Sequence, residues 1–234
     1  MPWGIWQALA VVAVFSATQP AVSYLTLYLP LAATRSAQLM VAVPLTLGAS
    51  HAVGWLGAWW LVRRHHGLSF AVSLRLRGTA MGPGAVAKFL VAGMGMQILA
   101  RLAVVVAPPP PDLDFPLLHY LETGPEAVIL LLVAVGLLAP LLEEVLFRGL
   151  LYSALRKRWR FGPAALVVTA LFAALHAMQF QGYLPALVGI AALGALLAWL
   201  RERTGSLWPP VLVHAGFNLL GMLPLLTFLH QGPN

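Results

Sequence analysis

Six ionisable or amide side chains interrupt long apolar stretches of this 234-residue chain, at spacings that bring several of them onto shared helix faces. They are Glu143, Glu144, Arg148, His176, His214 and Asn218. Carboxylates and imidazoles are the usual general bases and metal ligands of enzymes, and an amide can donate to a developing oxyanion. These residue types could therefore activate a water molecule for hydrolysis or bind a metal ion.

The first group of these residues, Glu143, Glu144 and Arg148, contains two adjacent carboxylates that face different directions. Glu143 and Glu144 point about 100° apart on a helix, and Arg148 shares the face of Glu144 because it follows four residues later. A carboxylate followed by a cation at this spacing is the favourable order for an ion pair. We predict that Glu144 pairs with Arg148, which leaves Glu143 free to face the interior. The pair alone would also fit a simple ion pair at a helix end.

The two histidines lie in separate apolar stretches, each with a partner one helical turn away. His176 follows Phe172 at four residues, and Asn218 follows His214 at four residues. A single histidine on an apolar helix is more often a hydrogen-bonded packing residue than a ligand. A functional interpretation therefore depends on all three groups meeting in the fold.

The composition indicates what kind of element must carry these residues. Hydrophobic residues make up 60% of the chain and charged residues only 9%, whereas soluble domains carry about 25% charged residues. This excludes a soluble globule, and the apolar content excludes disorder. The chain has no cysteine, so thiolate catalysis and thiolate metal sites are excluded as well. We predict an all-α, polytopic membrane protein that forms a single domain over residues 1–234.

Seven segments are long and apolar enough to cross a membrane as helices. They cover residues 4–30, 39–62, 83–107, 125–150, 163–181, 184–200 and 207–229. A break at Gln19–Pro20 would split the first segment and give eight spans.

The positive charges predict the orientation of these spans. Ten basic residues fall in connections on one side, and we assign that side to the cytoplasm: Arg63, Arg64, Arg75, Arg77, Arg156, Lys157, Arg158, Arg160, Arg201 and Arg203. With seven spans, the N-terminus is inside and the C-terminus outside. The net charge of +7 is then an orientation signal in a cell membrane, and it carries no argument for nucleic acid.

Other polar residues inside spans are predicted to be structural. Arg101 lies near the outer end of its span, where it can extend toward Asp112 or Asp114. His51 stands alone and is interpreted as a packing residue.

The three groups, in this order on separate predicted helices, resemble the motifs of the CPBP intramembrane protease family. The motifs are EExxxR ending at Arg148, FxxxH ending at His176 and HxxxN ending at Asn218. This family includes the type II CaaX prenyl endopeptidases and bacterial bacteriocin-processing or immunity relatives. The resemblance covers about residues 125–220, which we take as the catalytic region.

The resemblance implies a membrane endopeptidase whose site opens toward the cytoplasm and acts on a peptide or protein substrate, lipidated in some members. It implies a catalytic cluster with two supporting residues, Glu144 and Arg148. The members of the cluster are Glu143, His176, His214 and Asn218.

Two chemistries fit this cluster. In one, Glu143 is the general base, His176 orients the water, and His214 and Asn218 donate to the oxyanion. In the other, Glu143, His176 and His214 bind Zn²⁺ and the open position holds water. An HExxH motif, the usual zinc protease template, does not occur in the sequence.

Two non-proteolytic functions use the same residues. Intramembrane Glu and His side chains can relay protons in a transporter, although no internal repeat is visible in the sequence. The cavity of a catalytically silent immunity protein could also bind a peptide without cleaving it.

Overall fold

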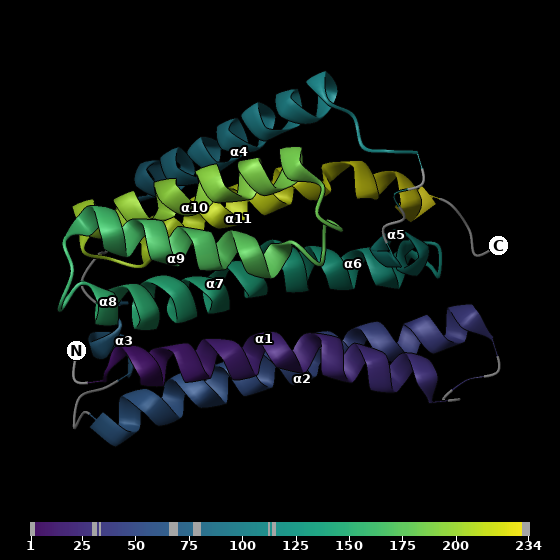
Figure 1. Cartoon of the computed structure of the whole chain (residues 1–234). Helices are drawn as coiled ribbons and strands as arrows, with labels where there is room; N and C mark the ends of the chain where they lie inside the picture. Colours follow the sequence, from purple (N-terminus) through teal and green to yellow (C-terminus); the bar gives the residue numbers. More distant parts are fainter. Residues whose placement is uncertain are drawn as a thin grey trace.

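The protein is a bundle of helices that run side by side along a common axis (Figure 1). The computed structural model describes residues 3–29, 32, 34–65, 70–76, 81–111, 113 and 116–230. Within these ranges the secondary structure is helical and contains no strand. The predicted all-α membrane bundle is therefore confirmed.

The chain passes through long helices joined by short turns. In chain order they are α1 (Ile5–Tyr28), α2 (Arg35–His65), α3 (Phe70–Ser73), α4 (Pro83–Val106), α5 (Pro116–Leu121), α6 (Pro125–Val133), η1 (Ala134–Leu138), α7 (Ala139–Glu144), η2 (Val145–Leu151), α8 (Tyr152–Leu155), α9 (Phe161–His176), α10 (Leu184–Thr204), α11 (Trp208–Met222) and η3 (Leu223–His230). Elements α6 to α8 follow one another without a break and form one composite helix, Pro125–Leu155.

Among the described residues, six helices have the length and hydropathy of membrane spans. Five of the predicted spans correspond to α1, α2, α4, α10 and the composite helix, and a sixth to Trp208–Leu226. The remaining predicted span, 163–181, is the apolar helix α9, which ends earlier, at His176, and has only 16 residues. Helix α1 continues through Pro20, so the structure gives no additional span at that position.

Hydrogen bonds link the connections that carry most of the predicted cytoplasmic basic residues. The Trp208 indole donates to the Leu76 carbonyl, and Lys157 donates to the Trp3 carbonyl. Arg156, which lies outside the spans, forms a hydrogen-bonded ion pair with Glu202. The hydrogen bond to Glu202 raises the pKa of Arg156. These contacts place the start of α1, the turn after α8 and the α10–α11 turn together at one end of the bundle, on the left of Figure 1. Arg77 lies outside the described residues.

The composite helix lies between the α1–α2 hairpin and the layer formed by α9, α10 and α11 (Figure 1). Its side chains at Leu142, Val145, Leu146 and Leu150 are fully buried. A central position explains how this span can carry charged residues, because its surroundings are protein and not lipid.

Two glycines bring α4 and α11 into backbone contact. A Cβ atom added to Gly93 would overlap the carbonyl oxygen of Val213, and one added to Gly216 would overlap the carbonyl oxygen of Leu90. Small residues permit such close crossings between membrane helices. This crossing fixes α11, the helix that carries His214 and Asn218.

Candidate active site

The composite helix departs from α-helical geometry on both sides of the carboxylate pair. The π-helical segments η1 and η2 flank α7, which ends at Glu144. At the end of η1, the Ala139 N–H donates to the Ala134 carbonyl five residues earlier. Such π turns are frequent at functional sites because they rotate the residues that follow relative to a regular helix.

Glu144 and Arg148 form a fully buried ion pair. The Arg148 Nη1 donates to Glu144 Oε1 at 2.9 Å, and Nη2 donates to the Gly194 carbonyl of α10 at 3.0 Å. The guanidinium also lies over the ring of Phe172, 4.6 Å from its centroid. The pairing predicted from the i, i+4 spacing is therefore confirmed. It ties together three helices, since Phe172 belongs to α9.

His214 joins this pair from α11. Its Nδ1 lies 3.0 Å from Glu144 Oε1. Because an ionised carboxylate only accepts, we assign a proton to Nδ1, which donates it to Glu144. The Nε2 atom of His214 is 3.8 Å from Oε2 of Glu143.

His176, the last residue of α9, approaches Glu143 in the same way. Its Nδ1 lies 2.7 Å from the Phe172 carbonyl, which can only accept, so Nδ1 donates, and in the neutral form of the ring Nε2 is an acceptor. This Nε2 lies 4.0 Å from Oε2 of Glu143. The packing of Phe172 against both imidazoles, with ring centroids 4.6 and 5.6 Å away, holds the two rings in position.

The Nε2 atoms of His176 and His214 thus face one carboxylate oxygen of Glu143, and no donor of the described residues forms a hydrogen bond with this oxygen. The Oε2 atom of Glu143 is buried and has no hydrogen-bond partner in the part of the protein that the structure describes. Separations of 3.8 and 4.0 Å are too long for direct hydrogen bonds, but one water molecule can bridge them. Glu143 and His176 side chains keep 16% and 17% exposure against 4% for His214, so access is from the side of Glu143 and His176.

The same three side chains have the donor atoms of a zinc site but not its spacing. Ligand atoms of tetrahedral Zn²⁺ lie about 3.3 Å apart, given bonds of about 2.0–2.1 Å. The measured 3.8 and 4.0 Å are wider. Among the residues with a described position, no group of three or more His, Asp or Glu side chains has metal-ligand geometry.

Asn218 lies one turn beyond His214 on α11, and its side chain has a backbone partner. Its Nδ2 donates to the Val135 carbonyl in η1 at 2.8 Å. Val135 precedes Glu143 by eight residues, about two helical turns. The structure therefore brings together Glu143, Glu144, Arg148, His176 and His214, while the predicted oxyanion role of Asn218 stays a prediction.

Two residues predicted to be structural have backbone partners. Arg101 donates to the carbonyls of Leu220 and Gly221 near the end of α11, whereas the predicted partners Asp112 and Asp114 lie outside the described residues. His51 bonds through Nδ1 to the Leu47 carbonyl at 2.8 Å.

Sequence reasoning missed the Gly194 carbonyl, which binds Arg148. A backbone acceptor leaves no signal in residue type, so only the buried Arg148 side chain could have pointed to such a partner.

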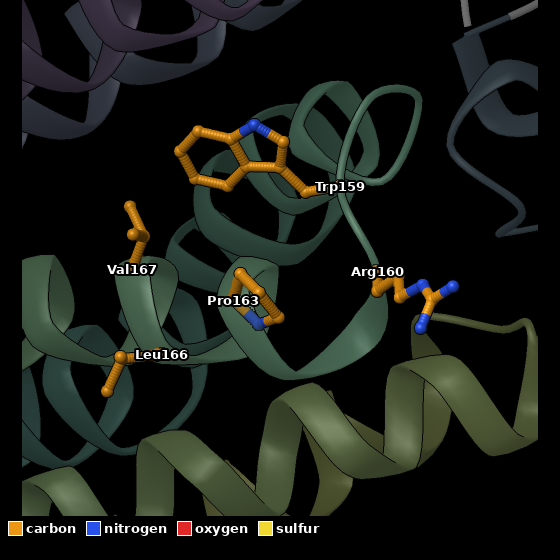
Figure 2. A pocket seen from close by; sticks show the side chains of 5 residues that line it. All are labelled: Trp159, Arg160, Pro163, Leu166 and Val167. Atoms are coloured by element: carbon orange, nitrogen blue, oxygen red, sulfur yellow. The ribbon is translucent and has the colours of Figure 1, made fainter.

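A hollow at the start of α9 is distinct from this cluster. Its walls come from Trp159, Arg160, Pro163, Leu166 and Val167 (Figure 2). Leu166 is 70% exposed, and the hollow carries none of the carboxylates or histidines of the cluster. Its apolar lining fits a surface against lipid.

The fold and the cluster define an integral membrane protein of the helical class, with a buried Glu–His site in its central span. Residues 125–220 match the family of "Type II CAAX prenyl endopeptidase Rce1-like" proteins. The family prediction from the three motifs is thus confirmed over the segment that contains the whole cluster.

Two curated relatives each match a little under half of the chain. An "Uncharacterized 24.3 kDa protein" of Escherichia coli is 40% identical over 98 residues, which is 41% of this chain and 44% of the relative. A "Putative membrane peptidase YdiL" of Bacillus subtilis is 29% identical over 110 residues, 45% of this chain and 43% of the relative. The chain therefore spans less than half the length of these relatives. No solved structure gives a significant match.

Proposed function

We propose that the protein is an intramembrane endopeptidase that hydrolyses a peptide bond with a water molecule activated by Glu143. The observation that carries this proposal is the convergence of the Nε2 atoms of His176 and His214 on the unpartnered Glu143 Oε2, at 4.0 and 3.8 Å. The match to the Rce1-like family and the peptidase relative support the same activity.

The first step is proton transfer and attack. A water held by the Glu143 carboxylate and an imidazole Nε2 loses a proton to Glu143 Oε2 as its oxygen attacks the peptide carbonyl carbon. The Oε2 atom of Glu143 is itself buried, and a low-dielectric surrounding strengthens this interaction. His176 orients the water, since its own Nδ1–H is already fixed by the Phe172 carbonyl.

The second step is collapse of the tetrahedral intermediate. Glu143 returns the proton to the leaving nitrogen, so the same group acts as base and then as acid. His214 donates to the negative oxygen from Nε2 in its doubly protonated form, whose second proton is taken up from bulk water before the attack, and Glu144 stabilises this imidazolium through Nδ1. The ion pair with Arg148 holds Glu144 in the orientation that this requires.

Several finer features extend the proposal. The substrate is a peptide or protein, lipidated as the family description suggests. The protein lies in the cell membrane with its N-terminus and its site toward the cytoplasm, because the basic residues gather at one end of the bundle.

The test is cleavage by the purified protein in liposomes, with fluorogenic peptides that carry a CaaX end in farnesylated and unmodified form. Glu143→Gln should lower the cleavage rate by at least ~100-fold, as expected for loss of a general base. The matched control is Glu126→Gln, an exposed carboxylate at the start of the same composite helix, which should cleave at the wild-type rate. Full activity of Glu143→Gln would remove Glu143 from the mechanism. Proton uptake into vesicles that Glu143→Gln blocks, without peptide cleavage, would favour a transporter.

Chelation decides between the two chemistries. A glutamate mechanism predicts unchanged cleavage after incubation with 1,10-phenanthroline. Loss of cleavage that added Zn²⁺ restores would instead make Glu143, His176 and His214 ligands, brought closer together than in the present geometry.

A further inference from the structure

The Val135 carbonyl in η1 has lost both backbone donors that its helix could offer. In an α-helix its donor would be the Ala139 N–H, but this N–H bonds the Ala134 carbonyl in the π register. In the π register its donor would be residue 140, which is proline and has no N–H. A carbonyl left without a donor inside a membrane protein costs free energy.

The side chain of Asn218 supplies the missing donor. Its Nδ2 reaches the Val135 carbonyl at 2.8 Å, a distance typical of a good N–H···O bond. The neighbouring residues pack closely: a Cβ on Gly136 would lie 2.9 Å from Leu219 Cδ2. The contact is therefore part of a tight interface between η1 and α11.

We propose that Asn218 is a positioning residue, whose amide replaces the N–H that Pro140 lacks and thereby fixes the register between α11 and the helix that carries Glu143. His214 lies one turn before Asn218 on α11, and Glu143 lies three residues after Pro140. The bond to Val135 therefore sets how far His214 Nε2 is from Glu143 Oε2. In this role Asn218 does not itself contact the oxyanion. The activity measurement that tests the inference rests on the proposed function.

A double-mutant cycle between residues 140 and 218 tests the inference. Pro140→Ala restores a backbone N–H five residues after Val135, in the π register of η1. In the wild-type background, Asn218→Ala should lower kcat by at least ~10-fold with little change in KM, as expected when a buried acceptor loses its donor. In the Pro140→Ala background the same substitution should lower kcat by less than ~3-fold, because the restored N–H can replace the lost donor.

Thermal unfolding gives a second measurement that needs no substrate. Asn218→Ala should lower Tm by about 2–4 °C or more in the wild-type background, and by much less in the Pro140→Ala background. If wild-type protein cleaves none of the peptides, the proposed function fails, yet the Tm cycle still decides whether Asn218 replaces the Pro140 donor. Asn218→Leu has a side chain of similar size but no donor, so it leaves no cavity. It should change Tm in the two backgrounds in the same way as Asn218→Ala.

The matched control is Gln97→Ala, since Gln97 is a half-buried amide on α4 whose side chain lies against Gly221 of α11. Its effects should be equal in both backgrounds. Equal losses for Asn218→Ala in both backgrounds would overturn the inference and make Asn218 a group that acts on the reacting atoms. Unchanged kcat and Tm for Asn218→Ala in the wild-type background would also overturn it.

Discussion

Arg148→Met should be among the most destabilising single substitutions in this protein. The change removes two hydrogen bonds, of 2.9 Å to Glu144 and 3.0 Å to the Gly194 carbonyl. It also leaves the Glu144 carboxylate, which is fully buried, with only His214 as a partner among the described residues. Breaking a buried ion pair in this way costs about 3–5 kcal/mol of unfolding free energy.

The chain contains an exposed pair that serves as a matched control. Arg156 and Glu202 are also hydrogen-bonded, but their side chains are 32% and 34% exposed. Because solvent screens such a pair, Arg156→Met should cost at most ~1 kcal/mol. The difference between the two substitutions measures the effect of burial on the same chemical pair.

Reversible unfolding in mixed micelles of increasing SDS content, followed by far-UV circular dichroism, gives the free energies. The double substitution Glu144→Gln with Arg148→Met removes both charges and should recover at least ~2 kcal/mol relative to Arg148→Met alone. If Arg148→Met costs no more than Arg156→Met, or if the double substitution recovers nothing, the buried pair does not stabilise the site as argued.

Two further predictions follow from helix contacts and from histidine surroundings. Gly93→Ala should lower Tm by several degrees and reduce cleavage, because the added methyl group overlaps the Val213 carbonyl and displaces α11, whereas Gly95→Ala on the same helix meets nothing within 4 Å and should be neutral or stabilising. Equal effects of the two would contradict the close crossing. His214→Ala should lower cleavage by at least ~100-fold while His51→Ala leaves it within ~3-fold, measured on folded protein in liposomes. A comparable loss for His51→Ala would contradict its interpretation as a packing residue.

Much of the fold could be predicted because the membrane constrains a sequence strongly. Scarce charges and long apolar runs indicated the helices, and the i, i+4 spacing indicated the Glu144–Arg148 pair that the structure contains. The relative height of the helices was a harder problem. The distance along α9 from Pro163 to His176 does not determine whether His176 lies level with Glu143, because the sequence of a helix does not specify its axial position relative to its neighbours. In the structure the two side chains meet.

The partner of Asn218 could not be predicted for a different reason. The acceptor is a backbone carbonyl that exists only because η1 is π-helical and Pro140 follows it. Pro140 has no backbone N–H, but the sequence does not say which carbonyl is left without a donor. Likewise, Arg148 donates to the Gly194 carbonyl, and a backbone acceptor of this kind cannot be identified from residue types.

The Glu144–Arg148 pair also bears on how the chain is made. Both residues lie in the same helix, one turn apart, so the pair can form as soon as that helix does. Because the chain is made from its N-terminus, both residues are synthesised before Gly194 and His214. The central span can therefore enter the bilayer with one acid of the adjacent Glu143–Glu144 pair already neutralised by its own arginine. The later helices then close around a charge pair that never faces lipid unpaired.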